Sequence, residues 1–207
     1  MEESTSNSTP AGQDDQNQDP PLAVISRTTR RPTAGAAPPD GQPTGPPGYR
    51  TVYLLSYVPS PLFPAHWSMW VPYRGSDGGV SKRGIRLHVT GDSRNGFAHD
   101  FDRAYDLDED DRRPRVMAAG RIEERDVADP PTPEGASAYE AYNRLERVAL
   151  SIPAPRPSMR AASSNAVRTR VALQNCQTWM ADFVRALVDQ GLIEQSAQTV
   201  LDECPKN

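Results

Sequence analysis

The sequence predicts one α+β domain that follows a Pro-rich tail. Between residues 51 and 122, short segments with alternating apolar and polar residues are separated by turn sequences, which is typical of an antiparallel sheet. In the last third of the chain, apolar residues recur instead every three or four positions, which is typical of helices that bury one face. Strands that are followed by helices favour an α+β fold, in which a small antiparallel sheet packs on C-terminal helices.

Five segments fit strands, because each alternates or is rich in β-branched and aromatic residues: 51–58, 66–73, 84–90, 96–105 and 115–122. The turn sequence RGSDGG separates the second segment from the third, so we expect these two to pair. His66 and His88 lie on this pair of strands. If both side chains face the same side of the sheet, the register of the pair determines whether they meet.

The second half of the chain contains three predicted helices. The first covers 136–150 and ends before a cluster of prolines, and a short one covers about 194–203. Between them, a strongly amphipathic helix carries apolar residues at helical spacing: Cys176, Trp179, Met180, Phe183, Val184, Leu187 and Val188. Asn175 suits the start of this helix, and Gly191 suits its end.

Residues 1–48 form a tail that we expect to be disordered. The segment holds nine of the 21 prolines and many Ser, Thr, Gln and Asn, with few large apolar residues. Such a composition cannot bury enough apolar surface to offset the entropy that is lost on ordering. Residues 49–207 then match one ordinary α+β domain in size.

Composition and charge exclude several classes of function. The chain has 23 basic and 27 acidic residues and a net charge of −4, so it lacks the cationic surplus that nucleic-acid binding requires. No apolar run is long enough to span a membrane, and the first thirty residues do not resemble a secretory signal. We therefore expect a soluble, cytoplasmic protein.

The sequence predicts neither a metal nor a cofactor. Two cysteines cannot supply a disulfide framework or a Cys-rich zinc site. His66, His88 and His99 lack the spacing of zinc ligands, and the acidic stretch 100–111 lacks the pattern of a calcium loop. Cys204 has no candidate base nearby in the sequence.

Cys176 is the strongest candidate for chemistry. With Asn175 as the N-cap, the thiol would lie in the first turn of a helix, where unpaired N–H groups and the helix dipole favour a thiolate. His66 and His88 could supply a base and a group that orients it. Two alternatives stay open: Cys176 also suits a core position on the apolar stripe, and a helix that begins near Asn165 would place it in mid-helix.

Three short motifs resemble those of the permuted papain-like enzymes: HWSMWV at His66, RLHVTG at His88 and NCQTW at Cys176. Their order is similar to that in the lecithin:retinol acyltransferase-like and PPPDE-like branches of the NlpC-type superfamily. The resemblance implies a permuted papain-like fold with Cys176 as the nucleophile, His66 as the general base and His88 as the orienting residue. Asn175 and Gln177 could add side-chain donors for an oxyanion.

The chain departs from the lipid-acting branch after the cysteine. Gln177 and Thr178 stand where an acidic residue and a His often follow in that branch. The chain is also similar to uncharacterised fungal proteins with the pattern HW…HVTGD…GF…NCQ-W, a resemblance that brings no activity with it.

These observations favour a cysteine-dependent acyl-transfer enzyme, either a hydrolase or an acyltransferase. Its substrate would be an amide, thioester or ester of a small molecule or peptide. The fungal resemblance adds, as a weaker idea, a role in a small-molecule biosynthetic pathway. The alternative is a non-catalytic binding or accessory module of the same fold, in which Cys176 is a core residue.

Overall fold

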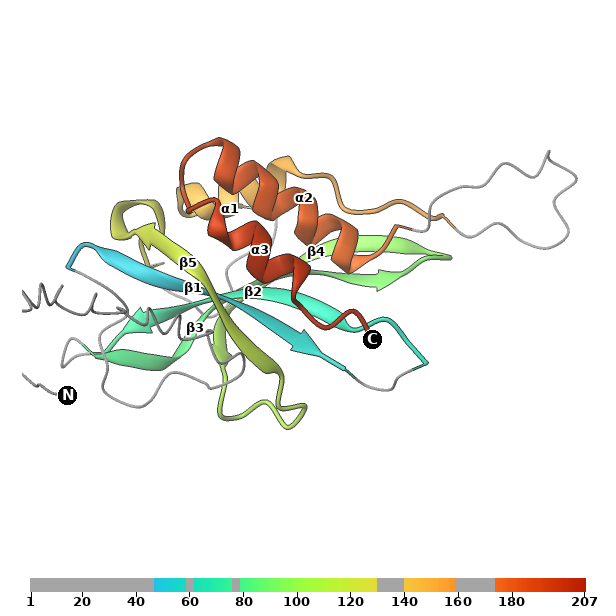
Figure 1. Cartoon of the computed structure of the whole chain (residues 1–207), viewed down its shortest axis with the longest axis horizontal. Coiled ribbons are helices and arrows are strands. Elements are labelled where there is room, and N and C mark those ends of the chain that lie inside the picture. The colour runs from blue at the N-terminus through green and yellow to red at the C-terminus, as the bar shows by residue number, and fades with distance from the viewer. Residues whose placement is uncertain (1–46, 59–61, 76–78, 130–139, 159–173) are drawn as a thin grey trace, which may run out of the picture. The chain divides into compact units, whose positions relative to one another are not determined.

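The computed structural model describes residues 47–58, 62–75, 79–129, 140–158 and 174–207, which all belong to one compact unit. In this part of the chain the sheet has five strands: β1 (Tyr49–Tyr57), β2 (His66–Arg74), β3 (Val80–Asp92), β4 (Gly96–Asp106) and β5 (Arg115–Glu123). They are followed by the 3₁₀ turn η1 (Glu124–Asp126) and by helices α1 (Arg144–Ser151), α2 (Cys176–Asp189) and α3 (Ser196–Asp202). All pairings are antiparallel, in the order β4-β3-β2-β1-β5, and the helices lie over one face of the sheet (Figure 1).

The predicted α+β class, with an antiparallel sheet and helices after it, is confirmed. All five expected strands form, and β2 pairs with β3. Residues 1–46 of the expected tail lie outside the described residues. Among the described helices, none has the length and apolar character that a membrane crossing requires.

The structure corrects two expectations about where helices begin. Gln174 and Asn175 are not helical and α2 begins at Cys176, so the alternative start near Asn165 is wrong. The helix expected over 136–150 begins only at Arg144, although its first residues, 136–139, lie outside the described part. Its start is set by Asn143, whose side chain accepts a hydrogen bond from the third helical residue.

The sheet separates two apolar clusters. Their members show toward which face each side chain of β2 and β3 points. The larger cluster lies between the sheet and the helices and includes Trp67 and Leu87. The smaller cluster lies on the other face and consists of Tyr53, Leu55, Tyr57, Trp70, Tyr105, Leu107 and Val116. Because neighbouring side chains of a strand point to opposite faces, His66 and His88 project toward the smaller cluster.

Helix α2 is capped at both ends by residues that suit these positions. The Asn175 side chain accepts hydrogen bonds from the backbone N–H groups of Gln177 and Thr178, and the Thr178 hydroxyl accepts one from the Asn175 N–H. At the other end, Gly191 adopts a φ of 66°, which a residue without a Cβ tolerates best. These caps make Cys176 the first helical residue, as one reading of the sequence predicts.

A buried ion pair fastens α1 to β4. Arg103 and Glu146 are 2% and 0% exposed, and the guanidinium donates from Nε and Nη2 to the two carboxylate oxygens at 2.9 Å each. The carboxylate also accepts from the Tyr142 N–H at 2.8 Å, and the guanidinium also donates to the Glu140 carbonyl at 2.7 Å. A buried pair is tolerated when its remaining donors and acceptors are satisfied in this way.

We expect Glu146→Gln to lower the free energy of unfolding by about 3–5 kcal/mol, because it leaves the Arg103 charge buried without a counter-ion. The double variant Arg103→Met/Glu146→Leu removes both charges and should regain much of this loss. Urea unfolding followed by circular dichroism measures all three proteins. A double variant that is no more stable than Glu146→Gln would contradict this account.

Candidate thiol and imidazole site

Cys176 lies where the first turn of α2 meets the start of β2. Its Sγ is 3.9 Å from the Ala65 carbonyl oxygen, and the residue is 7% exposed. Burial raises the pKa of the thiol above its ordinary value, although the backbone N–H groups of Trp67, Gln177 and Cys176 itself oppose this rise. The expected thiolate is therefore not the resting form, because the cost of burying a charge exceeds the help of the helix start.

His66 and His88 form a hydrogen-bonded pair. Met69 on β2 lies opposite Leu87 on β3, and this register places the two histidines diagonally across the same face of the sheet. His66 Nε2 is 2.9 Å from His88 Nδ1, and the ring centroids are 5.0 Å apart at an interplanar angle of 77°. The register that the sequence leaves open thus brings the two imidazoles together.

Both imidazoles are neutral at pH 7. Burial lowers the pKa of His66 to about 4, with further contributions from Arg86 and Arg112. Burial lowers the pKa of His88 to about 2, again with contributions from Arg86, from His66 and from Arg112. Each neutral ring carries one N–H, so each ring offers one donor and one acceptor.

Asp100 favours one arrangement of the protons on the two imidazole rings. Its Oδ2 is 3.4 Å from His88 Nε2, a buried atom that has no hydrogen-bond partner among the described residues. A lone pair on Nε2 would be repelled by this carboxylate, which favours the tautomer in which Nε2 carries the proton and Nδ1 accepts from His66 Nε2–H. This arrangement leaves a lone pair on His66 Nδ1, to which no described residue donates.

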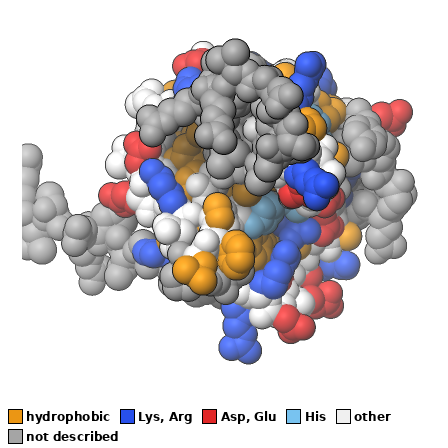
Figure 2. All heavy atoms as spheres, turned by 90° about the vertical axis from the view of Figure 1, so that its right-hand side faces the viewer, with side chains coloured by type: hydrophobic (Ala, Val, Ile, Leu, Met, Phe, Trp, Pro, Cys, Tyr) orange, Lys and Arg blue, Asp and Glu red, His pale blue; other side chains and the backbone are white. Residues whose placement is uncertain are grey.

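An open pocket of about 800 Å³ brings the thiol and the imidazoles to one surface. Cys176, His66, His88 and Asn175 all line it. Figure 2 looks onto the end of the molecule from which α2 starts, and there histidine side chains lie among hydrophobic side chains and beside basic ones. The volume is large enough for a drug-sized ligand.

The thiol and the His66 ring both line this pocket, but they lie on opposite faces of the sheet. Cys176 belongs to the cluster between the sheet and the helices, whereas the His66 ring is 5.7 Å from the Tyr57 ring of the other cluster. Among the described residues, no hydrogen bond joins Cys176 Sγ to His66. The two groups therefore share the pocket without a direct proton path between them in the free protein.

The start of α2 has two candidate donors for an oxyanion. The N-cap accepts from the N–H groups of the second and third helical residues and leaves the Cys176 N–H unused by the cap. Asn175 makes these contacts through Oδ1, so its Nδ2 amide points elsewhere and has no partner among the described residues. Asn175 lines the pocket, so this amide is a second candidate donor.

Gln177 is not available as an oxyanion donor, the role that the sequence suggests for it. Its Nε2 donates to the carbonyl oxygens of Ala65 and Lys206 at 2.8 Å each, so both amide hydrogens are used. The side chain therefore connects three backbone segments instead of facing an oxyanion.

The C-terminal residues Pro205 and Lys206 hold the start of β2 in place. The Ala65 N–H donates to the Lys206 carbonyl at 2.9 Å, and Trp67 Nε1 donates to the Pro205 carbonyl at 2.7 Å. These contacts lie on both sides of His66. No pattern in the sequence indicates them, because they join residues that are far apart in the chain.

His99 and Cys204 lie outside the site. His99 Nε2 is 2.9 Å from the Ile152 carbonyl oxygen, and its ring packs beside Trp179. Cys204 is 3% exposed, and burial raises the pKa of its thiol to about 12. Within the described ranges, no group of three or more His, Cys, Asp or Glu residues could hold a metal ion.

Comparison with protein families gives a match over residues 52–194, which is well over half of the chain. The matching family is described as a family of unknown function, DUF6540. The chain belongs to this family. The DUF6540 match includes His66, His88 and Cys176 but ends before α3 and before residues 205 and 206. No curated protein and no solved structure matches the chain.

We expect the free energy of unfolding to fall as the pH drops from 6.5 to about 5. The folded-state pKa values of His66 and His88 lie below the ordinary 6.5, so the unfolded chain binds more protons in this range. The loss is at most about 1.4 kcal/mol per pH unit for each imidazole. Urea unfolding at several pH values measures the slope. His88→Gln should flatten it, and an unchanged slope in this variant would contradict the burial of neutral rings.

Proposed function

We propose that the protein is a cysteine-dependent acyl-transfer enzyme in which Cys176 is the nucleophile, His66 the general base and His88 the orienting residue. The proposal is carried by the 2.9 Å contact between His66 Nε2 and His88 Nδ1 in the pocket that Cys176 also lines. A thiol, an oriented imidazole and donors for an oxyanion, here the Cys176 N–H and the Asn175 amide, are the parts that acyl transfer needs.

The proton positions favour general-base catalysis. His66 Nδ1 takes the proton of Cys176 as the sulfur bonds to the acyl carbon, and the imidazolium gives this proton to the leaving group as the carbon–leaving-group bond breaks. Water or an amine then loses a proton to His66, attacks the thioester and releases the thiol. His88 and Asp100 hold His66 in the tautomer that keeps Nδ1 available.

Substrate binding has to bring the thiol and the imidazole into contact. Catalytic hydrogen bonds are often long or absent in a free enzyme and form in the complex with substrate. The backbone N–H of Cys176 and the Asn175 amide would stabilise the oxyanion of the tetrahedral intermediate.

The order of the elements supports a permuted papain-like topology. His66 and His88 lie on successive antiparallel strands, and both precede the helix that Asn175 and Cys176 begin. This order agrees with the resemblance of the three sequence motifs. The substrate would then be an amide, thioester or ester of a small molecule or peptide.

The burial of Cys176 favours a second candidate function, a non-catalytic binding module. The residue packs in the larger cluster, and its thiol has a raised pKa. In this case the pocket binds a ligand beside His66 and His88, and the thiol stays inert.

Incubation with p-nitrophenyl acetate distinguishes these two functions. We expect a burst of p-nitrophenolate and an acetyl thioester at Cys176, detected by peptide mass spectrometry. Cys176→Ala should abolish the burst, and His66→Gln should slow it about 10²- to 10⁴-fold. The rate should rise with pH near pH 4, because His66 acts only when it is deprotonated.

Cys204 is the internal control for this experiment, since it is buried and lies outside the pocket. It should stay unmodified while the protein is folded. If Cys176 is acetylated only after unfolding, the enzyme proposal fails and the binding module is left.

The role of Asn175 is tested by two substitutions that separate capping from oxyanion binding. Asn175→Asp keeps a capping oxygen, so its free energy of unfolding should stay close to that of the wild type, whereas Asn175→Ala should lose about 1 kcal/mol. Both variants lack the Nδ2 donor, and both should slow acylation about 10²- to 10³-fold. Wild-type acylation by Asn175→Asp would remove this amide from the mechanism.

A further inference from the structure

We propose that the acyl substrate carries a carboxylate near its reacting carbonyl, that Arg112 binds this carboxylate, and that Arg94 adds positive charge to the same pocket lining. The inference rests on the proposed function, because it names the substrate class of the same site. It is carried by the charged side chains that line the pocket and by guanidinium N–H groups to which no described residue is bound.

The charged residues of the pocket lining are Arg94, Arg112 and Asp92. Asp92 accepts hydrogen bonds from the backbone N–H groups of Arg94 and Asn95 and from the Asn95 amide, at 2.7 to 2.9 Å. Its hydrogen bonds to Asn95 are the main reason why the pKa of this carboxyl is lowered. Asp92 is thus ionised, and its carboxylate is hydrogen-bonded within the turn between β3 and β4. The two guanidinium groups, in contrast, each have N–H groups to which no described residue is bound.

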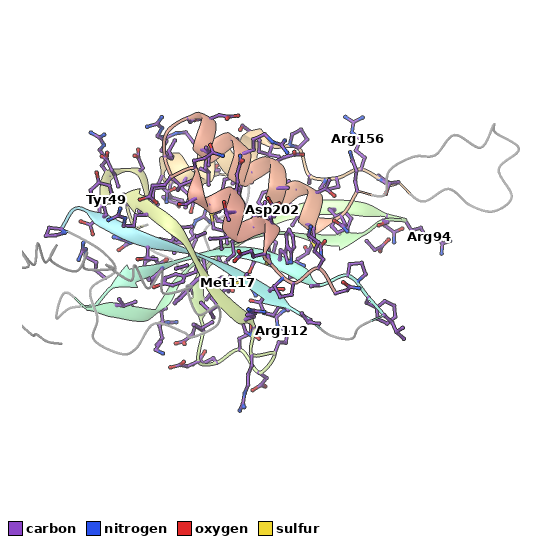
Figure 3. The ribbon with its side chains drawn as sticks, in the orientation of Figure 1. Tyr49, Arg94, Arg112, Met117, Arg156 and Asp202 are labelled. Carbon is purple, nitrogen blue, oxygen red and sulfur yellow. The ribbon has the colours of Figure 1, made fainter. Side chains whose placement is uncertain are left out.

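Arg94 lies at the tip of the β3–β4 hairpin (Figure 3). Its backbone N–H is bound by Asp92, but its guanidinium has no hydrogen bond or ion pair with any described residue. A guanidinium presents N–H donors in a planar fork that matches a carboxylate.

Arg112 lies in the loop between β4 and β5 (Figure 3). Its neighbours hold its guanidinium in position. Its Cζ is 4.4 Å from the centroid of the Tyr57 ring, and Asp110 accepts from its Nε at 2.8 Å and from its Nη2 at 2.6 Å. Asp110 in turn accepts from the Tyr105 hydroxyl at 2.9 Å. These contacts orient the guanidinium and leave Nη1 without a partner among the described residues.

The rest of the lining suits the uncharged part of such a substrate. Phe63, Pro64, Val89 and Phe97 contribute apolar surface to the pocket. A molecule that combines an apolar acyl chain with one carboxylate therefore matches both the apolar walls and the basic residues.

A bound carboxylate would also change the pKa of His66. Arg86 and Arg112 both lower the pKa of His66, which indicates a positive potential at the ring. A bound carboxylate would offset part of this potential and raise the pKa of His66 toward its ordinary value. The substrate would in this way make His66 a stronger base at the moment when Cys176 has to be deprotonated.

Alkylation of Cys176 with iodoacetate and with iodoacetamide tests the proposal. In both reactions the sulfur bonds to the reagent's methylene carbon, iodide leaves and the thiol proton is lost, but only iodoacetate carries a carboxylate. We expect the ratio of the iodoacetate rate to the iodoacetamide rate to be about tenfold higher for folded Cys176 than for the same thiol in urea, at low ionic strength. Arg94→Gln and Arg112→Gln should each lower this ratio, and added salt should lower it as well.

Arg125→Gln is the matched control, because it removes the same charge from an exposed side chain that does not line the pocket. It should leave the ratio unchanged. Equal ratios in folded and unfolded protein, or a ratio that neither pocket arginine affects, would overturn the carboxylate proposal while acylation of Cys176 still supports the enzyme.

A second measurement does not need a reactive thiol. Hexanoate and hexanamide are titrated into Cys176→Ala, and we expect hexanoate to bind more tightly by calorimetry and to lose this preference with Arg112→Gln. If Cys176 is inert but this preference is found, the enzyme proposal fails and the carboxylate site is retained. Equal binding of the two probes overturns the carboxylate site.

Discussion

The candidate site depends on the contact between the first turn of α2 and the residues that precede and begin β2. Gln177 connects the carbonyl oxygens of Ala65 and Lys206, and the Cys176 sulfur lies against the same Ala65 oxygen. Behind this contact, large apolar side chains of α2 pack in the core at 0% or 1% exposure: Trp179, Met180, Phe183, Val184 and Leu187. Side chains of this size cannot shift in a close-packed interior without opening cavities, so the backbone at the start of α2 is fixed relative to β2, and only the Cys176 and His66 side chains are left to move toward each other.

Burial gives the site a neutral resting state. It raises the pKa of the Cys176 thiol and lowers that of both imidazoles, so charge separation before substrate binds is unfavourable. A buried thiol is also a poor target for oxidation, because the thiolate is the form that oxidants attack. An enzyme of this kind would rely on its substrate to activate the nucleophile, in contrast to enzymes that keep a thiolate and an imidazolium ready.

The sequence predicts those features that follow from local patterns. The strands, the apolar face of α2 and the Asn175 cap follow from alternation, helical spacing and the chemistry of short polar side chains. It does not predict that α1 starts at Arg144, because the spacing of Tyr139 and Tyr142 also fits a helix. Features that depend on register or on distant segments were missed: the proximity of Asp100 to His88, the Arg112 position over Tyr57 and the partners of Gln177. The thiolate was predicted wrongly for the same reason, since burial is a property of tertiary packing.

The contacts of residues 205 and 206 have a consequence for how the protein is made. The ribosome synthesises β2 and both site histidines more than a hundred residues before it reaches Lys206, whose carbonyl binds the Ala65 N–H and the Gln177 amide. During synthesis, the start of β2 therefore lacks these hydrogen bonds, and the surroundings of His66 are completed only after residues 205 and 206 have been added. A nascent chain can form the sheet early, but it cannot hold the thiol and the imidazoles in their final arrangement until residues 205 and 206 are in place.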